Sequence, residues 1–214
     1  MLANPQPAPS RVERATVQFV DELPGWDRVL PTTMIRPAGT DGERRAALHR
    51  FVARALSLNP ALVEIEHASD RPPIVGRPLS SGLYLSTSTR GGLSAHGAAR
   101  APIGVAVEVV NEAAAIPWKA LHRAEAAMLE DLKGRPQAMA FARLVSLKEC
   151  YLKSLGVGLK RAPSGFSVRF RDGEAADVDD PETGVRVADA RTAWRSAGGL
   201  WLAISTVVLV RQRH

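Results

Sequence analysis

The 214-residue sequence has little of what stabilises secreted or membrane-embedded proteins. Cys150 is the only cysteine, so the chain can form no internal disulfide and no cysteine-based metal site, and a reducing compartment is expected. The longest apolar stretch, residues 198–210, contains Ser205 and Thr206 and is shorter than the ~20 residues that a membrane helix needs. Residues 1–10 lack the basic start and apolar run of a secretion signal. These absences predict a cytoplasmic protein that does not bind membranes.

Aromatic residues are also scarce, at 5% of the chain, and the basic residues are spread along the sequence rather than clustered. The 28 Lys and Arg against 22 Asp and Glu give a formal charge of +6, which favours an anionic partner. No recognised base-reading motif accompanies this charge. Nucleic acid is therefore not expected as a partner, whereas a nucleotide or the acidic surface of another protein fits the charge.

Hydrophobic periodicity predicts an α/β fold of two similar halves, residues 1–101 and 102–214. In the first half we expect a helix from Asp41, a loop over 70–81, and strands at 15–20, 62–67, 83–88 and 92–98, the last two joined by a turn at 89–91. In the second half we expect helices at 118–132 and 137–155 and strands at 103–110, 166–170 and 200–210. The two halves thus follow a rough common order of strands and helices.

Residues 143–159 contain the most informative pattern in the chain. On a helix, Glu149 and Lys153 lie one turn apart on one face, so a carboxylate that can bind a metal stands beside an ammonium group that can bind phosphate. The structural alternative is a common ion pair that stabilises a helix by ~0.2–0.5 kcal/mol. Glu108 ends the apolar strand at 103–110, where an ionised carboxylate needs a partner or a metal. Together these residues indicate a site that handles phosphoryl groups.

These two segments resemble the 4'-phosphopantetheinyl transferase superfamily, in its monomeric branch with two pseudo-twofold halves. That family has Gly-x-Asp-x-Glu on a strand and Trp-x-x-Lys-Glu-x-x-x-Lys on a later helix, which correspond here to residues 104–108 and 145–153. Three shorter segments resemble the family's Gly-Lys-Pro, Ser-His-Ser and Gly-x-Gly-Leu, namely residues 76–78, 86–88 and 156–159. The resemblance covers roughly residues 41–170.

The resemblance implies transfer of 4'-phosphopantetheine from coenzyme A to a serine of an acyl or peptidyl carrier protein, with Mg²⁺ neutralising the pyrophosphate. Carried over by position, Glu108 and Glu149 are the expected metal ligands, and Glu149 and Lys153 the expected catalytic residues. The side chains expected to contact coenzyme A are basic or carry a hydroxyl group: Arg50, Arg54, Arg77, Ser86, Thr87, Lys148 and Lys153.

The sequence departs from the family pattern at three positions. Ala106 stands where the family has its strand aspartate, and a methyl group cannot ligate Mg²⁺. Thr87 stands where the family has a histidine, and Val145 where it has tryptophan. Two outcomes are therefore open. In the first, the chain is a transferase whose Mg²⁺ keeps extra water ligands or is helped by Glu112. In the second, the chain is a degenerate relative that binds coenzyme A or a carrier protein without transfer.

Overall fold

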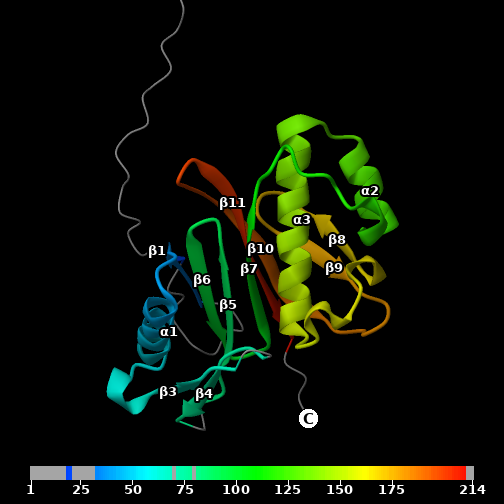
Figure 1. The fold of residues 1–214 in the computed structure, drawn as a ribbon. Coiled ribbons are helices and arrows are strands. Elements are labelled where there is room, and N and C mark those ends of the chain that lie inside the picture. The colour runs from blue at the N-terminus through cyan, green and yellow to red at the C-terminus, as the bar shows by residue number, and fades with distance from the viewer. Residues whose placement is uncertain (1–17, 21–31, 69–70, 79–80, 211–214) are drawn as a thin grey trace, which may run out of the picture.

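The computed structural model of the protein describes residues 18–20, 32–68, 71–78 and 81–210. The fold is mixed α/β, as the sequence predicts. Figure 1 shows α1 against one sheet and the long helix α3 beside β7 and β11 of a second sheet. None of the helices in the described part of the chain has the length and apolar character needed to span a bilayer.

The elements follow one another in two runs. The first run contains β1 (Gln18–Val20), β2 (Thr32–Pro37), α1 (Asp41–Ala55), η1 (Pro60–Leu62), β3 (Glu64–Glu66), β4 (Ile74–Arg77), β5 (Tyr84–Arg90) and β6 (Leu93–Ala99). The second run contains β7 (Ile103–Val109), η3 (Trp118–Ala120), α2 (Arg123–Glu130), α3 (Gly134–Ser154), η4 (Gly158–Lys160), η5 (Pro163–Gly165), β8 (Ser167–Phe170), β9 (Ala176–Asp179), β10 (Val187–Ala197) and β11 (Leu200–Leu209).

The two runs share one topology. The first forms an antiparallel sheet in the order β1-β2-β6-β5-β4-β3. The second forms the sheet β10-β11-β7 and the ladder β8-β9, which a single bridge between Ala175 and Arg191 connects to β10. Apart from β1, the order β2-β6-β5-β4-β3 therefore corresponds to β7-β11-β10-β9-β8, and a helix follows the first strand in each series. This correspondence agrees with the prediction of two similar halves, while the domain boundary at 101/102 stays a prediction.

The two sheets face each other across a shared apolar core. Buried side chains from β2 and β6 meet those of β7 and β11 there, among them Ile35, Leu93, Ala95, Val105, Val107, Leu202 and Ile204. A hydrogen bond between the hydroxyl groups of Thr33 and Thr206, 3.3 Å apart, also joins β2 to β11. The halves consequently bury part of their apolar surface only against each other.

Several strands differ from the sequence prediction. β4 lies within the segment expected to be a loop, and β2, β9 and β10 were not predicted. In β10 Asp189 and Arg191 alternate with the buried Ala190 and Thr192, which are too small or too polar to give a strong apolar signal. The turn between β5 and β6 is Gly91-Gly92, where both residues have positive φ, as two-residue hairpin loops often require. Residues 1–10 and 15–17, to which predictions also applied, lie outside the described residues.

The helices differ from the prediction at their ends. The helix expected at 118–132 is interrupted, because His122 adopts an extended conformation and caps α2 in a reciprocal box with Glu125. Helix α3 begins at Gly134, three residues before the predicted start, with Pro136 in its first turn. A proline is tolerated there because the first N–H groups of a helix have no intrahelical partner.

Helix α3 approaches β7 closely at Gly104. A Cβ atom built on this residue would overlap the backbone carbonyl of Cys150. Ala106, on the same face of β7, is fully buried with Leu147, Cys150 and Tyr151 of α3. The absence of a side chain at position 104 therefore sets the distance between the helix and the strand.

We predict that Gly104→Ala lowers the free energy of unfolding by about 3 kcal/mol or more, because the new methyl group meets backbone that cannot rotate away. The matched control is Gly42→Ala in α1, where a Cβ meets nothing within 4 Å. There we expect a gain of about 0.4–1 kcal/mol. Urea unfolding at pH 7 measures both changes, and equal stabilities of the two variants would contradict the close approach.

Candidate functional site

A groove of about 820 Å³ lies where α1, β5 and β6 meet the C-terminal end of α3. Its lining includes five cationic side chains and one carboxylate: Arg44, Arg45, Arg71, Lys153, Lys160 and Asp41. The remaining wall is formed by Leu48, residues 67–68 and 72–73, Ser86, Thr87, Thr89, His96 and residues 156–158. The groove thus combines an excess of positive charge with hydroxyl and imidazole groups.

One face of α1 forms part of the groove wall. Positions 41, 44, 45 and 48 are spaced by three or four residues, so they share a face of the helix. Arg45 Nη2 lies 2.9 Å from Asp41 Oδ2, which holds the carboxylate among the guanidinium groups. Arg50 and Arg54 follow Leu48 by two and six residues, about 200–240° round the helix, and they are exposed outside the groove. The structure therefore brings Arg44 and Arg45 to the site in place of the predicted Arg50 and Arg54.

Lys153 lies at the junction of α3, β5 and β7. Its Nζ is 2.8 Å from Glu149 Oε1 and donates hydrogen bonds to the carbonyl oxygens of Thr87 and Val105, at 3.2 and 3.0 Å. The two predicted catalytic residues are thus in contact, and Lys153 lines the groove. Its ammonium group also connects strands from the two halves to the helix.

The predicted Ser86 and Thr87 both line the groove, but they face opposite sides of β5. Ser86 Oγ accepts a hydrogen bond from the backbone N–H of Val105 at 3.0 Å, which attaches β5 to the free edge of β7. Thr87 is paired in register with His96 of β6 on the side that faces α1. Thr87 is therefore the hydroxyl group of this pair that is available to a ligand.

The donors predicted to bind Mg²⁺ are each paired with a cation of the protein. Glu108 forms an ion pair with Arg90, and Glu149 one with Lys153, while Ala106 offers no donor. Glu112 lies beyond the end of β7 and is exposed. No group of three His, Cys, Asp or Glu side chains within the described residues is arranged to hold a metal ion. These residues do not fit a magnesium site held by the protein, because a hard divalent ion requires oxygen ligands free of competing cations.

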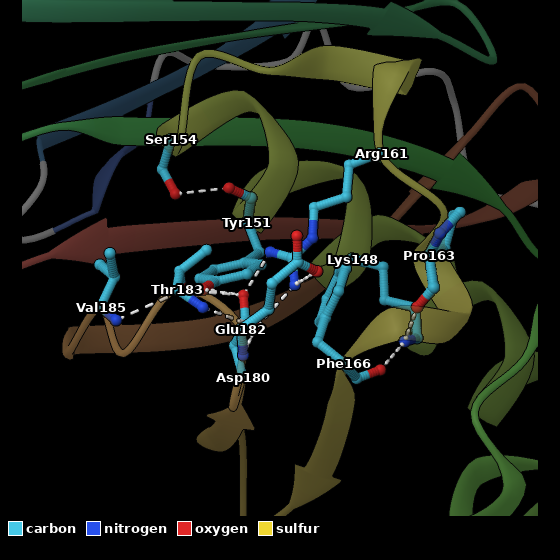
Figure 2. A network of polar contacts seen from close by, with 10 residues as sticks. All are labelled: Lys148, Tyr151, Ser154, Arg161, Pro163, Phe166, Asp180, Glu182, Thr183 and Val185. Atoms are coloured by element: carbon cyan, nitrogen blue, oxygen red, sulfur yellow. Dashed lines mark hydrogen bonds and ion pairs between the residues drawn. The ribbon is translucent and has the colours of Figure 1, made fainter.

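The remaining predicted residues lie outside the groove. Lys148 is buried, with its Nζ 2.7 Å from Glu125 Oε1 and donating to the carbonyl oxygens of Pro163 and Phe166 (Figure 2). Burial lowers the pKa of Lys148, and the contact with Glu125 opposes this shift. Arg77 is exposed and lies 3.5 Å from Glu64. The prediction that Lys148 contacts coenzyme A finds no support in this environment, since its donors hold α3 against α2 and η5.

Comparison with known proteins relates the second half of the chain to a family. Residues 102–204, which run from the start of β7 into β11 and include Glu108, Glu149 and Lys153, match the model of the 4'-phosphopantetheinyl transferase superfamily. These residues are a domain of that superfamily.

Among solved structures, the holo-[acyl-carrier-protein] synthase of Thermotoga maritima matches with 18% identity and a TM-score of 0.37. The match covers 50% of this chain and 63% of that one, so the chain aligns with less than two thirds of the synthase. No curated protein matches the sequence.

A buried polar network fixes the part of this transferase-superfamily domain that leads from α3 into the groove wall. Arg161 directly follows the groove-lining Lys160, and its Nη2 is 2.6 Å from Asp180 Oδ1 and 2.9 Å from Glu182 Oε2 (Figure 2). The hydroxyl group of Tyr151 donates to Asp180 Oδ2 at 2.6 Å. The guanidinium group lowers the pKa of Asp180, whereas burial raises the pKa of Tyr151 to about 12.

Sequence reasoning missed most of the cations in the groove. Arg44 and Arg45 could have been found from their spacing after the helix start at Asp41, and Lys160 because it follows the glycine-rich exit of α3. No sequence signal identifies His96, since its place depends on the pairing of β6 with β5.

We predict that Asp180→Asn lowers the free energy of unfolding at pH 7 by about 3 kcal/mol or more, because it leaves Arg161 buried without its main counter-charge. The folded-state pKa of Asp180 is lowered, so its contribution is present above the unfolded pKa of about 4 and is lost as the pH falls towards the folded value. The difference in free energy of unfolding between Asp180→Asn and the wild type should therefore become smaller below about pH 4.

The matched control is Asp177→Asn. Asp177 is part of exposed ion pairs with Arg169 and Arg171, so we expect a change of less than about 1 kcal/mol. Urea unfolding of both variants at pH 7, 5 and 3 gives the comparison. Two results would contradict the assigned role of Asp180. One is an equal loss of unfolding free energy in the two variants, and the other is a difference between Asp180→Asn and the wild type that grows as the pH falls.

Proposed function

We propose that the groove binds coenzyme A and that the protein transfers the 4'-phosphopantetheine group to a serine of a carrier protein. The observation that carries this proposal is the combination of a superfamily domain at residues 102–204 with a cation-rich groove beside its Glu149–Lys153 pair. Coenzyme A carries a diphosphate and a 3'-phosphate, which match five cationic side chains against one carboxylate. The volume of about 820 Å³ lies in the range of small-molecule sites.

The proposed transfer requires one bond to form and one to break. The serine Oγ of the carrier protein attacks the phosphorus that bears the pantetheine arm. The bond from that phosphorus to the bridging oxygen breaks, and its electron pair leaves with adenosine 3',5'-bisphosphate. The half-buried Glu149 carboxylate takes the serine proton, and the ammonium group of Lys153 offsets the charge that develops on the leaving phosphate.

A specific observation favours a second candidate, a relative that binds coenzyme A or a carrier protein without transfer. Ala106 replaces a carboxylate of the family pattern, and Glu108 is neutralised by Arg90. The negative charge of the diphosphate would then be neutralised by the cationic side chains of the groove alone. Such a groove supports binding of the ground state without special stabilisation of the transition state.

We predict that Arg44→Ala raises the Kd for coenzyme A about tenfold, as expected for a lost charge-assisted hydrogen bond to phosphate. The control is Arg50→Ala, on the opposite side of the same helix, for which the Kd should stay within about twofold of wild type. Isothermal titration calorimetry measures both values. Weaker binding in the Arg50 variant alone would place the ligand outside the groove.

We predict that wild type labels apo carrier protein with a tagged coenzyme A and that Glu149→Gln reduces the rate about 10²-fold or more, because the general base is lost. Glu130→Gln, at the exposed end of α2, serves as the control and should label at the wild-type rate. The assay is run with Mg²⁺ and with chelator. An Ala106→Asp variant is included, with its folding checked by circular dichroism because position 106 is buried.

The outcomes separate the two candidates. Labelling by wild type supports the transferase, and its loss in chelator would show that Mg²⁺ is required despite the paired carboxylates. Labelling by the Ala106 variant alone, or coenzyme A binding with no labelling, would establish the second candidate. Absence of coenzyme A binding would reject both.

A further inference from the structure

His96 is a buried histidine at the wall of the groove, and its exposed fraction is 2%. Neither its Nδ1 nor its Nε2 makes a hydrogen bond to any residue that the structure describes. Two unpaired polar atoms in a protein interior are unfavourable and rarely occur without a role. Because His96 also lines the groove, a ligand there is the natural partner for these atoms.

The position of His96 on its sheet directs it towards the groove. Along β6, His96 alternates with Ala95 and Gly97, and Ala95 lies in the core shared with β7. Its register partners are Thr87 of β5 and Met34 of β2. Met34 packs with α1, and Thr87 lines the groove, so this face of the sheet continues from the core under α1 into the groove.

The electrostatic surroundings of His96 favour the neutral imidazole. Burial, together with the charges of Arg36 on β2 and Arg44 on α1, lowers its pKa to about 4. A neutral imidazole has one N–H donor and one acceptor nitrogen. The cations that line the groove with it select an anionic ligand, whose oxygen atoms accept hydrogen bonds.

We infer that His96 is a ligand-binding residue whose ring N–H donates a hydrogen bond to a phosphate oxygen of bound coenzyme A, an inference that rests on the function proposed above. The contact gives the buried donor a partner only in the complex. The free protein therefore carries an unsatisfied polar group that ligand binding relieves. A histidine with a purely structural role would instead be satisfied in the free protein, as His49 is through its Nε2, 2.8 Å from the carbonyl oxygen of Val63.

The test compares two histidine-to-phenylalanine variants, each of which keeps a ring of similar size. His96→Phe removes two unpartnered polar atoms, so the melting temperature of the free protein should be unchanged or higher. Its Kd for coenzyme A should rise about tenfold or more. His49→Phe, outside the groove, removes a satisfied hydrogen bond and should lower the melting temperature, with the Kd within about twofold of wild type.

Two further measurements keep the inference testable should His96→Phe fail to fold. The ¹⁵N resonances of the His96 ring in the wild type should shift on addition of coenzyme A, and His96→Asn, which keeps an N–H donor, should retain more affinity than His96→Ala. Repetition with dephospho-coenzyme A locates the contact. If His96→Phe also weakens the binding of dephospho-coenzyme A, His96 contacts the diphosphate. If it weakens the binding of coenzyme A alone, His96 contacts the 3'-phosphate.

Each outcome decides a separate point. Coenzyme A binding that is unaffected in His96→Phe, or ring resonances that do not move, would overturn the role of His96 and leave the proposed function intact. A lower melting temperature without a change in Kd would assign His96 a structural role. Failure of the wild type to bind coenzyme A would overturn the proposed function, and this inference with it.

Discussion

The ammonium group of Lys153 joins the two halves of the molecule at the edge of the groove. This one cation contacts the carboxylate of Glu149 and donates hydrogen bonds to the carbonyl oxygens of Thr87 and Val105, so α3, β5 and β7 share a single charged centre. The hydroxyl groups of Ser86 and Ser88 complete the junction, because they accept hydrogen bonds from the backbone N–H groups of Val105 and Val107. Backbone N–H groups on the edge of β7 that is not paired with β11 are thereby hydrogen-bonded to side chains of β5. These contacts fix the position of β5, which forms part of the groove wall, relative to the core.

The charges around this junction explain how the chain differs from its family pattern. That pattern has two carboxylates on one face of a strand and a third on a later helix. Here Ala106 is packed under α3, and Glu108 is compensated by Arg90 at the end of β5. An arginine beside a lone carboxylate removes the negative potential that would attract a divalent cation. The positive charge of the groove is instead supplied by fixed side chains of the protein, five of which line it.

The fold could be predicted from sequence where one physical signal dominated. The strand at β7 is a continuous apolar run, and α3 has regular helical spacing, so both were predicted nearly to their ends. β10 was missed because its buried positions carry the small residues Ala190 and Thr192 rather than large apolar ones. In the candidate site, the contact between Glu149 and Lys153 could be predicted from their spacing on one helix, while their roles stay predictions. The groove lining was missed where it depends on a helix phase, as with Arg44 against Arg50, or on a strand register, as with His96.

Lys148 shows the limit of a motif more directly. Its position beside Glu149 suggested a ligand contact, yet the next helical position points 100° away, into the core where Glu125 lies. The same motif thus supplies one side chain to the groove and another to the interior. Sequence adjacency carries no information about that division, but helical spacing does, because Lys148 lies one turn from the buried Leu144 and Tyr151.

The shared topology of the halves leaves one question, why the cation-rich groove forms beside α1 and not between α3 and its own sheet. Helix α3 buries side chains from Ala138 to Ser154 and, at Gly104, has no space between itself and its strand. Helix α1 buries residues only from Ala47 onward, because its first turns carry Asp41, Arg44 and Arg45. Charged groups cannot be packed against a sheet without large desolvation, so the start of α1 leaves Thr87 and His96 facing a groove rather than a core. The polar start of α1 therefore forms one wall of the candidate site, and the exit of α3 forms another.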